Sequence, residues 1–331
     1  MPEKPRTSPL LTLAKSWERA LRAGTATRKQ GKKPASSYTI RNYRKTLRLL
    51  DTHLAEHRTA ATLEAMTADV LNDWLDGLAE ESSPGNALHH YRNLTALYAW
   101  VVRTERMLSA GQNPMLDVLA PSANDTPRPP LSEAQVAAMI KTCSGRDRGF
   151  EDVRDEAIIR VFADTGMRLG GLVGLTYHPD HEGLDNEGVS DVFLDHDPAL
   201  LRLRLKGGKT HLVDISSRTT AALDRYIRAR SQRSVYYHKT LWVGKRGPLG
   251  RSGVQKMIRE RGAAAGIPEH VHPHRFRRSM ATWHLDAGGS RDALKSRAGW
   301  SSDQMINVYV SDSRERLAWK ESQKLGIADR F

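Results

Sequence analysis

Five residues in the second half of the chain are of types that together could act on a phosphate ester. They are two arginines, a lysine, a histidine and a tyrosine, namely Arg168, Arg277, Lys206, His274 and Tyr309. His274 and Arg277 stand three positions apart at the start of an apolar helical pattern, so both project to one side of it. Lys206 ends an alternating strand pattern before two glycines, where a long side chain can reach into a cleft. Singly, each type is more often a surface or packing residue, so only the combination is informative.

One reaction needs all of these types at once, the attack of a tyrosine on a phosphodiester. The pentavalent phosphorus carries extra negative charge, which two arginines can hold through bidentate hydrogen bonds. A tyrosine titrates near ~10, so it needs a base or a positive field to become a nucleophile. The leaving 5′ oxygen needs a proton, which a lysine or a histidine can donate. The reaction requires no metal, and the sequence has none of the usual metal-ligand spacings, so we expect neither a metal nor another cofactor.

The order and spacing of these residues resemble those of the tyrosine recombinase family, also called the phage integrases. The resemblance is specific over residues 131–315 and less specific over the helical residues 10–120. Five motifs carry it, and in chain order they are Thr165-Gly166-Met167-Arg168 for the family's T-G-x-R, Lys206 with Lys209 for its K-G-x-K hairpin, His274 with Arg277 for its H-x-x-R box, Gly299-Trp300-Ser301-Ser302 for its G-[H/W]-S-S segment, and Tyr309 nine residues after Trp300.

The resemblance implies a role for each residue. Tyr309 would attack the scissile phosphate, form a 3′-phosphotyrosyl bond and release a 5′ hydroxyl. Because this link conserves the bond energy, strand exchange would need no ATP. The other implied roles are phosphate binding for Arg168 and Arg277, base and phosphate ligand for His274, proton donor to the leaving oxygen for Lys206 with Lys209 as the alternative, and support of the phosphate or packing of the site for Trp300.

The resemblance also implies the partners. They are double-stranded DNA with specific recombination sites and three further copies of the chain, as a homotetramer on that DNA. Accessory DNA-bending proteins remain open as further partners, as do the target sequence, the direction of recombination, the biological role, and cleavage in cis or in trans. The segment after Tyr309, residues 311–331, is equally suited to docking on a neighbouring subunit and to folding back on its own domain.

Three positions depart from the family pattern. Gly171 stands where the family usually has a glutamate that orients the first arginine, and Arg278 stands where it often has a histidine. Trp300 replaces the commoner histidine, and an indole can donate one hydrogen bond but cannot exchange a proton. We therefore expect altered support around the first arginine and the same chemistry.

An acidic stretch, 177–198, lengthens the chain between the first arginine and the lysine. It contains four residues of metal-ligating type, His178, Asp180, His181 and Glu182. We expect a solvated surface loop here rather than a metal site, although the sequence does not reveal its role.

The composition is that of a globular protein with two domains, and its charge favours a polyanionic partner. The chain has 331 residues, a net charge of +13 and one cysteine, which excludes a disulfide framework. Residues 1–50 carry a net +11 and residues 201–300 a net +16, with a net −14 between them. Two basic blocks favour a clamp that grips DNA from two sides. Since no apolar run reaches ~18 residues and no signal peptide is present, we expect a cytoplasmic protein without a membrane partner. The resemblance implies a bacterial or phage-encoded protein that associates with the nucleoid.

Apolar periodicity predicts a helical unit at 1–120, a linker at 121–130 and a mixed unit at 131–331. In the first unit it predicts helices over about 10–21, 40–54, 71–78 and 88–101, with Thr67 as an N-cap and Ser82-Ser83-Pro84-Gly85 as a breaker. Four prolines keep the linker extended.

In the second unit, Ser132 to Gln135 forms a capping box, and a helix ends near Gly166. A strand at 201–206, a turn at Gly207-Gly208 and a strand at 211–215 form a hairpin. Further helices are expected at about 217–231, 252–265, 276–287, 290–298 and 302–309. We therefore predict a mainly α protein of two domains, an all-helical core-binding domain for DNA and a mixed α+β catalytic domain with a small antiparallel sheet.

Two other functions fit the same residues. A nicking and closing enzyme like the type IB topoisomerases shares this chemistry, and it would relax supercoiled DNA without a specific site. A non-catalytic helical DNA-binding regulator would use the five residues as phosphate contacts only. Trapping of a covalent protein–DNA complex separates the regulator from the two enzymes.

Overall fold

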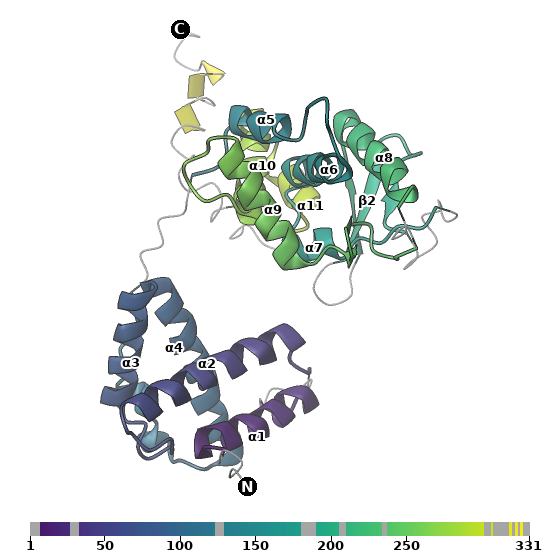
Figure 1. The fold of residues 1–331 in the computed structure, drawn as a ribbon. Helices are drawn as coiled ribbons and strands as arrows, with labels where there is room; N and C mark the ends of the chain where they lie inside the picture. Colours follow the sequence, from purple (N-terminus) through teal and green to yellow (C-terminus); the bar gives the residue numbers. More distant parts are fainter. Residues whose placement is uncertain are drawn as a thin grey trace. The chain divides into compact units, whose positions relative to one another are not determined.

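The computed structural model describes residues 7–26, 33–122, 129–179, 190–204, 210–233 and 237–300, and in the C-terminal segment residues 306, 318, 319, 322, 323, 325 and 326. The chain divides into two compact units, Met1–Pro127 and Arg128–Phe331, and the division lies inside the predicted linker. In the described residues the first unit is all-helical, and the second combines helices with small antiparallel sheets (Figure 1). The predicted fold class is therefore confirmed.

The described part of the first unit consists of four α-helices and three short helical turns. They are α1 (Pro9–Ala23), α2 (Ser37–Glu56), α3 (Ala68–Glu81) and α4 (Pro84–Trp100), then a π-helical turn (Val101–Glu105) and two 3-10 turns (Ala110–Gln112 and Pro114–Leu116). A serine or threonine caps each α-helix by accepting a hydrogen bond from the backbone N–H three residues on, and these caps are Ser8, Ser36, Thr67 and Ser83. The predicted cap at Thr67 is confirmed.

The predicted breaker before α4 is wrong in part. Ser83 is the N-cap of α4, and Pro84 and Gly85 already belong to the helix. Proline suits the first helical position because its fixed φ is helical and its missing N–H has no partner there. The core of this unit is formed by buried aromatic and aliphatic side chains, among them Leu10, Trp17, Leu47, Leu50, Leu71, Trp74, Leu94 and Tyr98.

A buried polar cluster joins α2 to α4 inside this core. The Thr46 hydroxyl and Nδ1 of His90 lie 2.8 Å apart, and Asn93 Nδ2 donates to the same hydroxyl at 2.8 Å. His90 Nε2 is buried and has no hydrogen-bond partner among the described residues. Burial, with smaller contributions from His89 and Lys45, lowers the pKa of His90 to about 4. The imidazole is therefore neutral in the folded protein at neutral pH.

His90 makes the stability of the protein depend on pH. Because the unfolded chain binds this proton near pH 6.5 and the folded chain only near 4, stability is fully present above 6.5 and is lost as the pH falls below it. Between about pH 7.5 and about pH 5 the residue should cost roughly 2 kcal/mol of the free energy of unfolding. Urea unfolding of the full chain at the two pH values measures this loss.

The control for this experiment is His90→Asn, whose amide can replace Nδ1 toward Thr46 and does not titrate. The variant should lose less stability than the wild type between the two pH values. An equal loss in both proteins would show that His90 does not carry the effect.

The second unit is built from seven helices and two small sheets in its described part. The helices are α5 (Glu133–Lys141), α6 (Phe150–Thr165), α7 (Leu169–Val173), α8 (Ser217–Ser231), α9 (Arg251–Ala264), α10 (Pro273–Asp286) and α11 (Arg291–Ala298). The capping box of Ser132 and Gln135 is confirmed at the start of α5, and the helices predicted at 217–231, 252–265 and 290–298 are confirmed to within one residue. Of the helix expected at 302–309, only Ile306 lies within the described residues, and it is helical.

Helix α6 is the central element of this unit. It packs against α8 on one side and α10 on another, and Figure 1 shows it in the middle of the unit. Phe162 of α6 and Phe276 of α10 stack with ring centroids 5.8 Å apart. The ends of α6 and α10 are therefore fixed relative to each other by a continuous apolar core.

A three-stranded antiparallel sheet with the order β1-β2-β3 lies beside these helices. Its strands are β1 (Val192–Phe193), β2 (Leu200–Arg204) and β3 (Thr210–Asp214), and a second sheet pairs β4 (Val243–Gly244) with β5 (Gly247–Pro248). The predicted hairpin is confirmed as β2 and β3, whose last pair in the described residues is Arg204 with Thr210. The predicted turn at Gly207-Gly208 lies outside the described residues.

The expectation of a solvated loop over 177–198 is wrong at the end of that stretch. Val192 and Phe193 are buried and form β1, which sequence periodicity missed because the strand has two residues. Asp191 is fully buried, and its Oδ2 accepts hydrogen bonds from the N–H of Thr176 at 2.9 Å and from its hydroxyl at 2.8 Å. This part of the stretch therefore completes the sheet. Asp180, His181 and Glu182 lie outside the described residues.

The end of the predicted linker is held by α10. Arg275 Nε donates to the carbonyl of Pro129 at 3.2 Å, and the N–H of Leu131 donates to the Ser279 hydroxyl at 2.7 Å. The chain is thus attached to α10 as soon as it enters the second unit. Among the described residues, no helix has both the length and the apolar composition needed to cross a membrane.

Candidate active site

The first predicted arginine follows a sharp turn at the end of α6. Gly166 ends the helix in the left-handed region with φ 57°, which glycine adopts without strain. A Cβ on Gly166 would lie 2.6 Å from Cε of Met280 and 3.3 Å from Cα of Arg277, so the turn also requires glycine for its close approach to α10. Arg168 stands at the N-cap position of α7 and is exposed. The T-G-x-R motif therefore brings an exposed arginine to the start of α10.

The second predicted arginine is buried and fixed by two backbone carbonyls. The side chain of Arg277 donates from Nη1 to Gly166 O at 2.8 Å and from Nη2 to Ala298 O at 3.0 Å. These carbonyls lie at the ends of α6 and α11, where helices leave carbonyls without partners and carry partial negative charge. Only 2% of Arg277 is exposed. Its guanidinium is therefore held in one orientation by two helix C-termini.

Trp300 lies against this guanidinium. The Cζ atom of Arg277 is 4.9 Å from the centroid of the indole ring, a cation–π distance. Gly299 ends α11 in the left-handed region with φ 62°, which turns the chain so that Trp300 enters a buried cluster with Leu294 and Ile306. Trp300 thus packs in this cluster and against the guanidinium of Arg277, and its predicted support of the phosphate stays a prediction.

His274 completes the described part of the site. It lies in the first turn of α10, which begins at Pro273 and not at 276 as predicted, because proline again starts the helix. One side of the residue is exposed, and the protein on its other side removes part of its hydration. This desolvation, with the positive charges of Arg277 and Arg168, lowers the pKa of His274 below its ordinary value. The imidazole is therefore neutral at neutral pH and can accept a proton.

The structure thus places Arg168, His274, Arg277 and Trp300 in one region around the start of α10. The other two predicted site residues, Lys206 and Tyr309, lie outside the described residues, and so does Lys209. Their neighbours in sequence are described at the two ends of the hairpin and at Ile306, which is fully buried. The roles of all six residues stay predictions at this point.

Two positions that depart from the family pattern, Gly171 and Arg278, differ in the space around them. A Cβ on Gly171 would meet no heavy atom within 4 Å, so space exists where the family usually has a glutamate. A Cβ on the neighbouring Gly170 would lie 2.8 Å from Nη2 of Arg251, so that arginine of α9 lies on the backbone of α7. Arg278, in place of the frequent histidine, is buried.

Sequence reasoning missed Arg297, which lies two residues before Gly299 in α11. Its guanidinium forms ion pairs with Asp164 of α6 and Asp214 of β3. In the sequence it is one of many cations in the basic block 201–300, and neither partner is near it in the chain. No local signal could have identified this cluster.

In the first unit, α2 carries a row of exposed cations. Arg41, Arg44, Lys45 and Arg48 follow the spacing of one helical face and line a shallow groove of about 360 Å³. Within this row, Arg44 also pairs with Glu18 of α1. A row of this kind suits a phosphate backbone.

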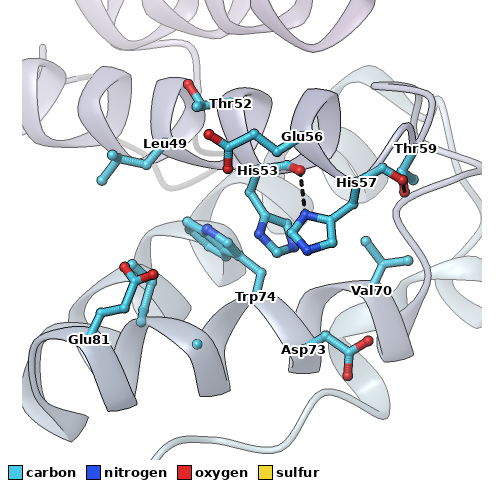
Figure 2. Close-up of a pocket in the computed structure, with 12 residues that line it drawn as sticks. Leu49, Thr52, His53, Glu56, His57, Thr59, Val70, Asp73, Trp74 and Glu81 are labelled. Atoms are coloured by element: carbon cyan, nitrogen blue, oxygen red, sulfur yellow. Dashed lines mark hydrogen bonds between the residues drawn. The ribbon is translucent and has the colours of Figure 1, made fainter.

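A second groove, between α2 and α3, has the opposite charge (Figure 2). Figure 2 shows His53 of α2 and His57, the C-cap residue of that helix, side by side, with ring centroids 4.0 Å apart, facing Trp74 of α3. Nδ1 of His57 donates to the carbonyl of His53 at 2.9 Å. Acidic side chains line this groove of about 450 Å³, namely Glu56, Asp73 and Glu81. Phosphate is repelled there, so the row on α2 is the better candidate for DNA contact in this unit.

A model described as the phage integrase family matches residues 130–316, more than half of the chain. The chain belongs to the phage integrase family. Among curated members, the tyrosine recombinase XerC of Actinobacillus pleuropneumoniae serotype 7 (strain AP76) is 27% identical over 290 residues, which cover 86% of this chain and 87% of the relative. As the sequence predicts, the protein is a tyrosine-type site-specific DNA recombinase.

Solved structures of integrase family members share the fold. The XerH site-specific recombinase bound to a palindromic difH substrate is similar with a TM-score of 0.68 and 15% identity, over 97% of this chain and 98% of that chain. A lambda integrase tetramer bound to a Holliday junction is similar with a TM-score of 0.65 and 15% identity, over 92% of this chain and 78% of that chain. At these identities the likeness shows a common two-domain architecture and nothing of individual side chains.

Proposed function

We propose that this recombinase breaks and rejoins DNA through a 3′-phosphotyrosyl intermediate formed by Tyr309. The tyrosine oxygen attacks the scissile phosphorus, the bond to the 5′ oxygen breaks, and that oxygen leaves with a proton as a hydroxyl. A 5′ hydroxyl from the partner strand then attacks the phosphotyrosine and releases the tyrosine. Each step exchanges one phosphodiester bond for another, so neither ATP nor an oxidant is consumed.

The observation that carries this proposal is the fixed guanidinium of Arg277 beside a neutral His274. The two helix C-termini that hold Arg277 set its orientation before substrate arrives, so no reorganisation is needed as charge develops on the phosphate. Arg168 is exposed and pairs with no carboxylate among the described residues, so it is available to a non-bridging oxygen. The two arginines together provide the charge that a metal ion supplies in other phosphoryl-transfer enzymes.

In this mechanism the neutral His274 accepts the proton of Tyr309. The positive charges that keep the imidazole neutral in the free enzyme are those of Arg277 and Arg168. Binding of the phosphate anion offsets these charges, which makes the imidazole a better base when the substrate is present. Lys206, or Lys209 from the same hairpin, donates the proton to the leaving 5′ oxygen.

We further propose that the row of cations on α2 contacts the phosphate backbone and that four protomers act together on two sites. Support for the tetramer comes from the fold shared with the lambda integrase tetramer. A DNA contact on α2 agrees with the net charge of +11 in residues 1–50. The groove of Figure 2 is lined by acidic side chains, which would repel the phosphate backbone.

The α2 row predicts the salt dependence of DNA binding. Each cation that neutralises a phosphate adds about −0.9 to the slope of log K against log salt. Replacing Arg41, Lys45 and Arg48 with glutamine should therefore make the slope less steep by about 0.9 for each phosphate that is no longer neutralised. Fluorescence anisotropy with a labelled site at several salt concentrations measures both slopes.

The matched control neutralises the acidic groove through Glu56→Gln, Asp73→Asn and Glu81→Gln. This variant changes three charges in the same unit and should leave the slope unchanged. An unchanged slope in the α2 variant, or an equal change in both variants, would contradict DNA contact at α2.

The direct test of the reaction is covalent trapping. A duplex with a nick next to the scissile phosphate loses the short 5′-hydroxyl strand after cleavage, so religation fails and the covalent complex accumulates. A recombinase or a topoisomerase gives this product, and a non-catalytic regulator does not. Only a recombinase shows a requirement for its own site, which a duplex of scrambled sequence tests.

A further inference from the structure

Arg297 connects three segments of the catalytic unit that are far apart in sequence. Its Nη2 atom donates to Asp164 Oδ1 at 3.0 Å, and its Nη1 atom forms an ion pair with Asp214 Oδ1. Nη2 also lies 3.4 Å from the carbonyl of Asp164 and 3.3 Å from that of Asp214. One guanidinium at the end of α11 thus holds the end of α6 and the end of β3.

Two further hydrogen bonds attach β3 to the same cluster. Ser216, which follows β3, donates its N–H to Asp164 Oδ2 at 2.7 Å. At the other end of the strand, Nε2 of His211 donates to the carbonyl of Arg297 at 3.1 Å. The backbone and the side chain of Arg297 therefore hold β3 near both of its ends.

Each of the three segments continues directly to residues of the proposed mechanism. Asp164 stands four positions before Arg168 at the end of α6. β3 begins at Thr210, the residue after the segment 205–209 that contains both candidate lysines. Ala298, next to Arg297, provides the carbonyl that accepts from Arg277. Arg297 therefore links the hairpin and α6 to α11 at the point where all three lead into the site.

The positive charge of Arg297 holds the two carboxylates of Asp164 and Asp214 close together. The side chains of Arg297 and Asp164 are only 22% and 14% exposed, so their charges interact with little screening. The hydrogen bond from Arg297 lowers the pKa of Asp214, and the carboxylates outweigh burial in raising the pKa of Arg297, so both groups are charged at neutral pH. Without the cation, two carboxylates would face each other and repel β3 from α6.

We propose that Arg297 is a positioning residue, which sets the β2–β3 hairpin against α6 and α11 so that the hairpin lysine reaches the leaving 5′ oxygen. This inference rests on the proposed role of Lys206 or Lys209 as the proton donor. In this role Arg297 contacts no substrate. Its loss displaces the donor and slows protonation of the leaving group, while the DNA-binding surfaces stay in place.

The test compares two cleavage substrates that differ in one atom. In the first, the 5′ bridging atom of the scissile phosphate is oxygen, and in the second it is sulfur. A thiol titrates near about 8.5, far below an alcohol, so a sulfur leaving group departs without a proton donor. The measured quantity is the rate of covalent complex formation by the full chain at saturating DNA.

We expect Arg297→Met to slow cleavage of the oxygen substrate by about 10²-fold, the effect of displacing a reacting group by about 1 Å. Cleavage of the sulfur substrate should slow by less than about tenfold, because it does not depend on the displaced donor. Equal slowing of both substrates, or no slowing of either, would overturn the proposal. A general loss of folding or binding would slow both equally, so the substrate pair separates positioning from mere stability.

Two more variants keep the proposal open to refutation if Arg297→Met does not fold. Asp214→Asn removes the same ion pair from the side of β3. It should also slow cleavage of the oxygen substrate more than that of the sulfur substrate, with less slowing than Arg297→Met causes. The double variant should be no slower than Arg297→Met alone, because both changes break one link. If the two substitutions slow cleavage additively, they do not act through one shared ion pair, and the proposal is overturned.

The matched control is Arg228→Met, which breaks an exposed ion pair with Asp224 on α8. It should change the cleavage rate of neither substrate.

A Lys206→Ala, Lys209→Ala variant tests the proposed function separately. It should lose cleavage of the oxygen substrate and retain cleavage of the sulfur substrate. If it loses both, the hairpin lysines do not donate the proton, and the role of Arg297 fails together with that step. If it behaves as expected and Arg297→Met does not, only the role of Arg297 fails.

Discussion

Tyr309→Phe should abolish covalent complex formation while DNA binding stays within a few-fold of the wild type. Phenylalanine fills the same space as tyrosine and lacks the oxygen that attacks phosphorus, so no phosphotyrosyl bond can form. Removal of a nucleophile of this kind costs at least about 10⁴-fold in rate. Trapping on the nicked duplex measures the covalent complex, and fluorescence anisotropy with the same duplex measures binding.

The matched control for this variant is Tyr237→Phe. Tyr237 lies in the same unit, is 68% exposed, and its ring lies beside that of His238 with centroids 4.5 Å apart. The control should form covalent complex at the wild-type rate. Covalent complex formed by Tyr309→Phe would remove Tyr309 from the mechanism, whatever the other residues do.

Arg277→Ala should reduce cleavage far more than affinity. Gly166 O and Ala298 O hold the guanidinium in one orientation. In the proposed mechanism it meets charge that develops only in the transition state, whereas DNA binding would be spread over many surface cations. Loss of one such donor group costs about 10²- to 10³-fold in rate. Affinity should fall by less than about tenfold, since in the proposed mechanism Arg277 is one of several cations that contact phosphates.

Arg275→Ala is the matched control for Arg277→Ala. Arg275 is as buried as Arg277, lies two residues before it on α10, and also donates to backbone carbonyls, those of Pro129 and Glu269. Its loss should lower stability and leave the cleavage rate of the folded protein nearly unchanged. If Arg277→Ala reduces affinity and cleavage by the same factor, Arg277 is a phosphate anchor without a part in the reaction. Equal slowing of cleavage by both variants would mean that burial of an arginine, and not its place in the site, causes the effect.

Local signals in the sequence predict most of the helices and part of the site. Serine and threonine caps, apolar spacing and the glycine that ends α6 act over a few residues, so Thr67, Ser132 and Gly166 are readable directly. The same holds for the H-x-x-R spacing of His274 and Arg277. Features that depend on residues within one helical turn can therefore be predicted from the sequence.

Features that depend on distant contacts were not readable. Strand β1 has only two residues, Val192 and Phe193, which pair with β2. Two residues are too few to produce an alternating pattern in the sequence. The start of α10 at Pro273 was missed because a proline before an apolar run reads as a break, although it also suits the first helical turn. The ion pairs of Arg297 join residues that are 133 and 83 positions apart, which no local pattern encodes.

The central claim is that a tyrosine at position 309 carries the DNA strand between the two steps. Its most direct measurement is mass spectrometry of the peptide attached to DNA after trapping of the wild-type protein on a nicked site, with a chelator present and without ATP. We expect one modified peptide with the 3′ phosphate on Tyr309, formed as fast as without the chelator. A DNA adduct on another residue, or no adduct until a metal or ATP is added, would contradict the claim.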